Sequence, residues 1–118
     1  CLHCQGKSRF LSKNPPHTAR IPLLLSMFPD AKFIYIHRRE QDVIRSTKNF
    51  FRQTLSALTL QNFSENELDC QIVNTYHALI GRYKKDRLLI NKSNLCEISF
   101  EDLIADKDST LDYIYSRL

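Results

Sequence analysis

The stretch FIYIHRREQDVIRST, residues 33–47, decides the fold of this 118-residue chain. Its first five residues are almost all apolar, which is typical of a central strand in a parallel sheet that is covered on both faces. Arg38 and Arg39 follow at the end of this strand. From Gln41 onward the apolar residues recur with helical spacing, so we predict a helix that carries Ser46. Arg38 and Arg39 therefore lie between a predicted buried strand and the predicted helix that follows it.

The segments before this stretch extend the pattern of strands and helices. RFLSKN at 9–14 is a β-compatible run that Pro15 and Pro16 close. A helix starting near Arg20 and ending at Pro29 follows, because Pro22 lacks an N–H and is tolerated in a first turn. The N-terminal third of the chain is thus predicted to form a strand–helix–strand unit.

The segments after this stretch complete the order. The helix after Arg39 has an apolar stripe that includes Val43, Thr47 and Phe50, and Ser64 with Glu67 forms a capping box that opens a second long helix. NLCEISF at 94–100 is a predicted third strand, and two short helical segments follow it. Three strands alternating with helices indicate an α/β protein, with a three-layer open parallel sheet and flanking helices.

Basic residues gather at the ends of the predicted strands. The net charge is +4, but residues 1–52 hold ten lysines and arginines against three acids. Ligands of open α/β sheets bind beyond the carboxyl ends of the strands, where Arg38 lies and where Lys13 ends the preceding predicted strand. A helix N-terminus carries about half a positive charge, and an arginine beside it adds a planar fork that matches two phosphate oxygens. Arg38, Ser46 and Lys13 therefore predict a pocket for a compact phosphate group.

Two other classes of function fit this sequence less well than a pocket for a compact phosphate group. A nucleic-acid-binding module would place cations along an exposed helix with aromatic residues free to stack, whereas the aromatic residues here are expected on buried stripes. A kinase-type enzyme would need a glycine-rich loop and Mg²⁺ ligands, which the sequence does not show.

The longest apolar run, IPLLLSMF at 21–28, is too short to span a bilayer.

The block LSKNPPHTARIPLLLSMFPDAKFIYIHRREQDVIRST, residues 11–47, resembles the central block of the sulfotransferases that use 3′-phosphoadenosine 5′-phosphosulfate (PAPS). In that family a strand ending in Lys-x-Pro leads through a helix and FPDAKF to a strand, an arginine and a serine. CEISFEDLIADKDSTLDYIYSRL at 96–118 is similar to the family's YEDLxxDPxxTLxxIxxFL ending. The resemblance implies a P-loop-NTPase-like sulfotransferase fold.

The resemblance also implies roles for the three residues. Arg38 and Ser46 match the arginine and serine that hold the 3′-phosphate of PAPS, and Lys13 matches the lysine beside the transferring group. The implied reaction is metal-free transfer of SO3 to a hydroxyl or amine of a small-molecule, glycan or protein acceptor. Neither nucleic acid nor contact of this segment with a membrane is expected. Members of the family act in the cytosol or in the Golgi lumen, and the sequence does not decide between these two compartments for this protein.

Several positions depart from the family pattern. Glu40 replaces a proline after the arginine, Phe100 replaces the tyrosine of YEDL, and Pro15 stands where the cytosolic branch has a catalytic histidine. The family's first strand and phosphosulfate-binding loop have no counterpart. We therefore expect residues 1–118 to be the central and C-terminal part of a single sulfotransferase domain, and the alternative is a fragment that is inactive on its own.

Overall fold

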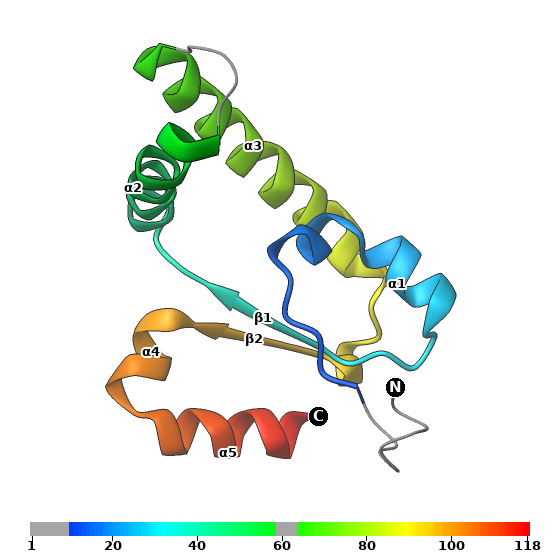
Figure 1. Cartoon of the computed structure of the whole chain (residues 1–118). Coiled ribbons are helices and arrows are strands. Elements are labelled where there is room, and N and C mark those ends of the chain that lie inside the picture. The colour runs from blue at the N-terminus through cyan, green and yellow to red at the C-terminus, as the bar shows by residue number, and fades with distance from the viewer. Residues whose placement is uncertain (1–9, 59–63) are drawn as a thin grey trace, which may run out of the picture.

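The computed structural model describes residues 10–58 and 64–118 and shows a small parallel sheet with helices around it (Figure 1). The elements in chain order are η2 (Pro15–Ala19), α1 (Ile21–Met27), β1 (Phe33–His37), α2 (Glu40–Leu58), α3 (Glu65–Asp86), η3 (Arg87–Leu89), η4 (Lys92–Asn94), β2 (Leu95–Ser99), α4 (Phe100–Ala105) and α5 (Lys107–Arg117). The predicted α/β class is confirmed. None of the helices in the described ranges has the length and apolar character needed to cross a membrane.

The two strands lie side by side and run in the same direction. Phe33 pairs with Leu95 at one end of the ladder and His37 pairs with Ser99 at the other. Both strands therefore end at the same edge of the sheet. Because parallel neighbours need a crossover, the chain between them travels through α2 and α3 before it returns to the sheet (Figure 1).

Helices lie against both faces of the sheet, which gives the three predicted layers. On one face Phe33, Tyr35 and Leu95 pack against a buried cluster of Ile21, Tyr83 and Ile90, which come from α1, α3 and the end of η3. On the other face Cys96 and Ile98 of β2 pack against Ile114 of α5. Side chains that alternate along β2 thus enter two separate apolar clusters.

The second face is covered beneath β2 but not beneath β1. Ile34 and Ile36 project from β1 on the same side as Cys96 and Ile98, because they pair with those residues across the sheet. They are nevertheless 43% and 48% exposed, since α5 packs against β2. The prediction that this strand is covered on both faces is therefore wrong for one face.

The predicted strand at 9–14 is also wrong for the residues that the structure describes. Residues 10–14 adopt no regular structure, and Phe10 and Leu11 are 72% and 86% exposed. A strand satisfies its backbone groups by pairing with a neighbour, and β1 pairs with β2 instead. Within residues 10–58 and 64–118, α1 therefore does not connect two strands, and the predicted N-terminal strand–helix–strand unit is not formed there.

The helix starts agree with the sequence patterns. Arg20 is the N-cap of α1, and Pro22 lies in its first turn. Ser64 accepts from the backbone N–H of Glu67 and donates its own backbone N–H to the Glu67 carboxylate, which completes the capping box of α3. These hydrogen bonds lower the pKa of Glu67. The helix then continues through Gly81 without interruption.

The helices α2 and α3 form a pair that extends away from the sheet (Figure 1). Lys48 Nζ of α2 lies 2.6 Å from Asp69 Oδ2 of α3, and this ion pair is half-buried. Phe50, which was predicted to lie on the buried stripe of α2, is 60% exposed. The stripe is therefore only partly covered by α3, and its outer part faces solvent.

Candidate functional site

Arg38 lies directly beyond the carboxyl end of β1, two residues before α2 begins. The register brings it level with Phe100, which directly follows β2. The guanidinium carbon of Arg38 lies 4.7 Å from the centre of the Phe100 ring, a cation–π contact. The predicted site arginine is therefore held between the ends of the two strands.

The acidic residues around Arg38 have side-chain partners of their own. Asp42 accepts a hydrogen bond from Arg45 at 2.6 Å, within α2. Glu101 lies 3.6 Å from Arg39, and the two side chains form an exposed ion pair. Glu40 Oε1 lies 2.8 Å from His77 Nε2 of α3. The positive charge of Arg38 is therefore not neutralised by an ion pair among the described residues.

Ser46 lies on the second turn of α2 and is exposed. It belongs to the same strand–helix junction as Arg38, although no hydrogen bond joins the two side chains in the described part of the chain. The first backbone carbonyl of the helix to accept is that of Arg39, from the N–H groups of Asp42 and Val43. The free N–H groups at this helix start therefore lie next to Arg38, as an anion site requires.

Lys13 is exposed and lies in the irregular segment just before η2. It does not end a strand, because residues 10–14 do not pair with the sheet. The helix η2 that follows packs against α3, whereas Arg38 and Ser46 belong to the β1–α2 junction. The structure therefore brings together Arg38 and the start of α2, but it forms no hydrogen bond or ion pair between Lys13 and either residue in the described ranges.

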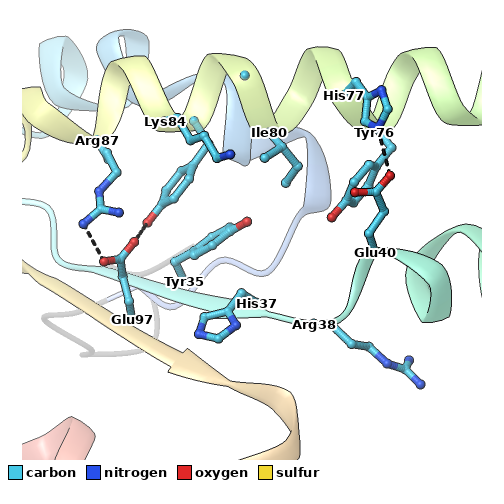
Figure 2. Close-up of a pocket in the computed structure, with 12 residues that line it drawn as sticks. Tyr35, His37, Arg38, Glu40, Tyr76, His77, Ile80, Lys84, Arg87 and Glu97 are labelled. Carbon is cyan, nitrogen blue, oxygen red and sulfur yellow. Dashed lines mark hydrogen bonds and ion pairs between the residues drawn. The ribbon is translucent and has the colours of Figure 1, made fainter.

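An open cleft of about 710 Å³ lies between the end of β1 and the side of α3 (Figure 2). Its lining includes Tyr35, Arg38, Glu40, Tyr76 and His77. Figure 2 shows that the Arg38 side chain points away from Tyr35 and Tyr76, so its backbone borders the cleft while its guanidinium lies outside. The cleft and the Arg38 guanidinium are thus on different sides of the β1–α2 junction.

A network of aromatic and charged groups forms one wall of this cleft. Tyr35 stacks on Tyr83 with ring centres 3.8 Å apart, and the Tyr83 hydroxyl donates to Glu97 at 2.5 Å. Glu97 also pairs with Arg87 at 2.7 Å. Burial raises the pKa of Tyr83 strongly, and the hydrogen bond to Glu97 raises it further. The Tyr83 hydroxyl therefore keeps its proton at ordinary pH, and it joins the buried aromatic pair to the Glu97–Arg87 ion pair.

Sequence reasoning missed two contacts at the site. The Glu40–His77 pair joins the start of α2 to the middle of α3, and the Arg38–Phe100 contact joins the ends of two strands. Both depend on the spatial arrangement of distant segments. Each contact includes a residue that departs from the family pattern, Glu40 or Phe100, but the pattern does not reveal its partner. No group of three or more potential metal ligands occurs within residues 10–58 and 64–118.

Comparison with known proteins now adds to this geometry. The model of the sulfotransferase family matches residues 1–118. The chain is 36% identical over 117 residues to the omega-hydroxy-beta-dihydromenaquinone-9 sulfotransferases of Mycobacterium bovis and Mycobacterium tuberculosis. The alignment covers 99% of this chain and 30% of each relative's length. No solved structure matches significantly. An arginine at a strand end, a helix start beside it and a family match over the whole chain lead to one conclusion: the chain belongs to the sulfotransferase family.

Proposed function

We propose that the protein containing this chain transfers a sulfuryl group from PAPS to an acceptor, and that residues 1–118 form the 3′-phosphate side of the PAPS site. The family match and the named activity of the mycobacterial relatives support sulfuryl transfer. The loop that holds the 5′-phosphosulfate belongs, in this proposal, to residues outside this chain. Residues 1–118 are then the central and C-terminal part of one sulfotransferase domain.

The observation that carries the proposal is the electrostatic setting of Arg38. Asp42, Glu101 and Glu40 are engaged by Arg45, Arg39 and His77. An anion at the start of α2 is therefore attracted by the Arg38 fork and by the N-terminal N–H groups of the helix. The Ser46 hydroxyl, on the next turn, donates a further hydrogen bond to the same 3′-phosphate.

Lys13 completes the proposed site as the cation near the transferring group. When bound, PAPS supplies the sulfuryl group, whose bond to the 5′-phosphate breaks as a bond from sulfur to the acceptor oxygen or nitrogen forms. Lys13 then neutralises charge on the leaving phosphate. Residues 10–14 have no strand partner among the described residues. For Lys13 to act near the transferring group, this segment must therefore move toward Arg38, or residues outside the chain must hold it close to Arg38.

The relatives' name gives the chemistry of one acceptor. They are sulfotransferases of an omega-hydroxylated menaquinone, which is a small molecule with a terminal hydroxyl. We therefore propose a small-molecule alcohol as the acceptor class. The acceptor hydroxyl loses its proton as the bond from its oxygen to sulfur forms.

Calorimetric titration of adenosine 3′,5′-bisphosphate into the full-length protein tests the PAPS site. Adenosine 5′-phosphate, which lacks the 3′-phosphate, is the control nucleotide. We expect Arg38→Ala to weaken bisphosphate binding about tenfold to a hundredfold, because a hydrogen-bonded charge of this kind contributes about 1.5–3 kcal/mol. The binding of adenosine 5′-phosphate should change little.

Arg39→Ala is the matched control, since it removes an equal charge one residue away. Its side chain is 77% exposed and pairs with Glu101, so we expect less than about a twofold change. Ser46→Ala should weaken bisphosphate binding by about 1 kcal/mol. Equal affinity for the two nucleotides in the wild-type protein would contradict the proposed function. It would favour the alternative that the basic residues 1–52 bind nucleic acid.

A further inference from the structure

The register of the sheet places an aromatic ring beside the proposed phosphate-binding arginine. His37 pairs with Ser99, and the next residue on each strand is Arg38 or Phe100. Both residues leave the sheet at the same edge. Phe100 is half-buried and is the first residue of α4, whose N-cap Ser99 accepts a hydrogen bond from the backbone N–H of Asp102. The ring is therefore attached to a capped and ordered helix start.

The Arg38 guanidinium lies over this ring. Its central carbon is 4.7 Å from the ring centre, well inside the range of a cation–π contact. The side chain is directed away from Tyr76 and Glu40, as Figure 2 shows. Glu101, next to the ring, pairs with Arg39 instead. Phe100 is therefore the side chain against which Arg38 rests in the described part of the molecule.

We infer that Phe100 is a positioning residue for the 3′-phosphate, because its ring fixes the plane of the Arg38 guanidinium. This inference rests on the proposed function. In this inference the guanidinium stacks on the ring with its flat face, as arginine does on aromatic side chains, and a phosphate takes the N–H donors in its plane. The two contacts are therefore compatible, because the Phe100 ring orients the Arg38 guanidinium while its N–H donors stay free to bind the phosphate.

The physical benefit is a smaller loss of side-chain freedom on binding. A free arginine has several rotatable bonds, and holding it for one phosphate costs conformational entropy. A guanidinium that already rests on a ring has lost part of this freedom before the nucleotide arrives. The effect needs an aromatic face but not a hydroxyl, so phenylalanine serves where similar sulfotransferases carry tyrosine.

The test is a double-mutant cycle on nucleotide selectivity in the full-length protein. The measured quantity is the ratio of the affinities for adenosine 3′,5′-bisphosphate and adenosine 5′-phosphate. We expect Phe100→Leu to lower this ratio about two- to fivefold, because it keeps the apolar volume but removes the aromatic face. Phe100→Tyr should preserve the ratio. In the Arg38→Ala background, Phe100→Leu should have no further effect.

The outcomes separate this inference from the proposed function. If the wild-type protein prefers the bisphosphate but Phe100→Leu leaves the ratio unchanged, the inference fails and the proposed function stands. An equal loss with and without Arg38 also overturns the inference, because the ring would then act through general packing. If the wild-type protein shows no preference, the proposed function fails and this inference fails with it.

A measurement on the wild-type side chain does not depend on the folding of the Phe100 variants. The Arg38 side-chain resonances, assigned by comparison with Arg38→Lys, should be shifted upfield by the ring current of Phe100. Addition of the bisphosphate should leave this shift in place while the N–H resonances move. Unshifted Arg38 resonances before and after nucleotide addition would overturn the inference.

Discussion

Tyr83 is the residue that joins the core to the charged groups at its border. Its side chain is 5% exposed, its ring stacks on Tyr35, and its hydroxyl donates to Glu97. Glu97 also accepts from Arg87, so the carboxylate keeps one strong partner if the hydroxyl is removed. We expect Tyr83→Phe to lower the free energy of unfolding by about 1–2 kcal/mol, measured by urea denaturation. Tyr115→Phe, at a position that is 81% exposed, is the control and should change little.

The same tyrosines predict the behaviour of the protein at alkaline pH. Burial raises the pKa of Tyr83, Tyr35 and Tyr76 above the ordinary value of 10.0. Above about pH 10 the unfolded chain loses these protons while the folded protein keeps them, so stability is full below pH 10 and falls as pH rises beyond it. Urea denaturation between pH 8 and about 11 measures this loss. Tyr83→Phe should reduce the slope, and an unchanged slope would contradict the assignment to Tyr83.

The helix α3 has a weak position at Gly81. The residue is exposed within the helix, and a Cβ added there would meet no atom within 4 Å beyond the local backbone of its own helix. We expect Gly81→Ala to raise the free energy of unfolding by about 0.5–1 kcal/mol, because glycine loses more backbone entropy in a helix. Ala78→Gly, at an exposed position of the same helix, should lower it by a similar amount. Thermal unfolding of both variants checks the pair, and a destabilised Gly81→Ala would refute the expectation.

The elements that the sequence predicts well are those fixed by local chemistry. Pro22 marks the start of α1, and Ser64 with Glu67 marks the start of α3, because caps act within one turn. The prediction of a strand at 9–14 was wrong for the described residues, because a strand depends on a pairing partner that the local sequence does not reveal. The position of Arg38 directly beyond an apolar strand agrees with the prediction, and its role as a site residue stays a prediction. Its contact with Phe100 was missed because it depends on the pairing of β1 with β2.

The molecule as a whole is more extended than a compact domain of its length. Its radius of gyration is 17.2 Å, whereas about 13–14 Å is typical for this number of residues. The α2–α3 pair extends from the sheet (Figure 1), and one face of β1 is uncovered. This shape supports the proposal that further parts of a sulfotransferase domain pack against the chain.

The exposed face and edge of β1 predict how the 118-residue chain behaves alone. An unpaired edge with exposed apolar residues is a template for association. We expect the isolated chain to self-associate as its concentration rises, and Ile36→Lys to reduce the effect, as measured by size exclusion with light scattering. Ile104→Lys is the control, since Ile104 is 60% exposed but lies on α4. A constant monomer mass for the wild-type chain would contradict this expectation.

The pairing of His37 with Ser99 has a consequence for how the sequence can vary. The relative position of Arg38 and Phe100 is set by hydrogen bonds across the sheet and not by the length of chain that joins the strands. Insertions or deletions in the segment between α2 and α3 should therefore leave the proposed phosphate site intact. A single residue added within β1 or β2 would instead turn Arg38 or Phe100 to the opposite face of the sheet. Tolerance to changes in length should thus be high far from the ladder and absent within it.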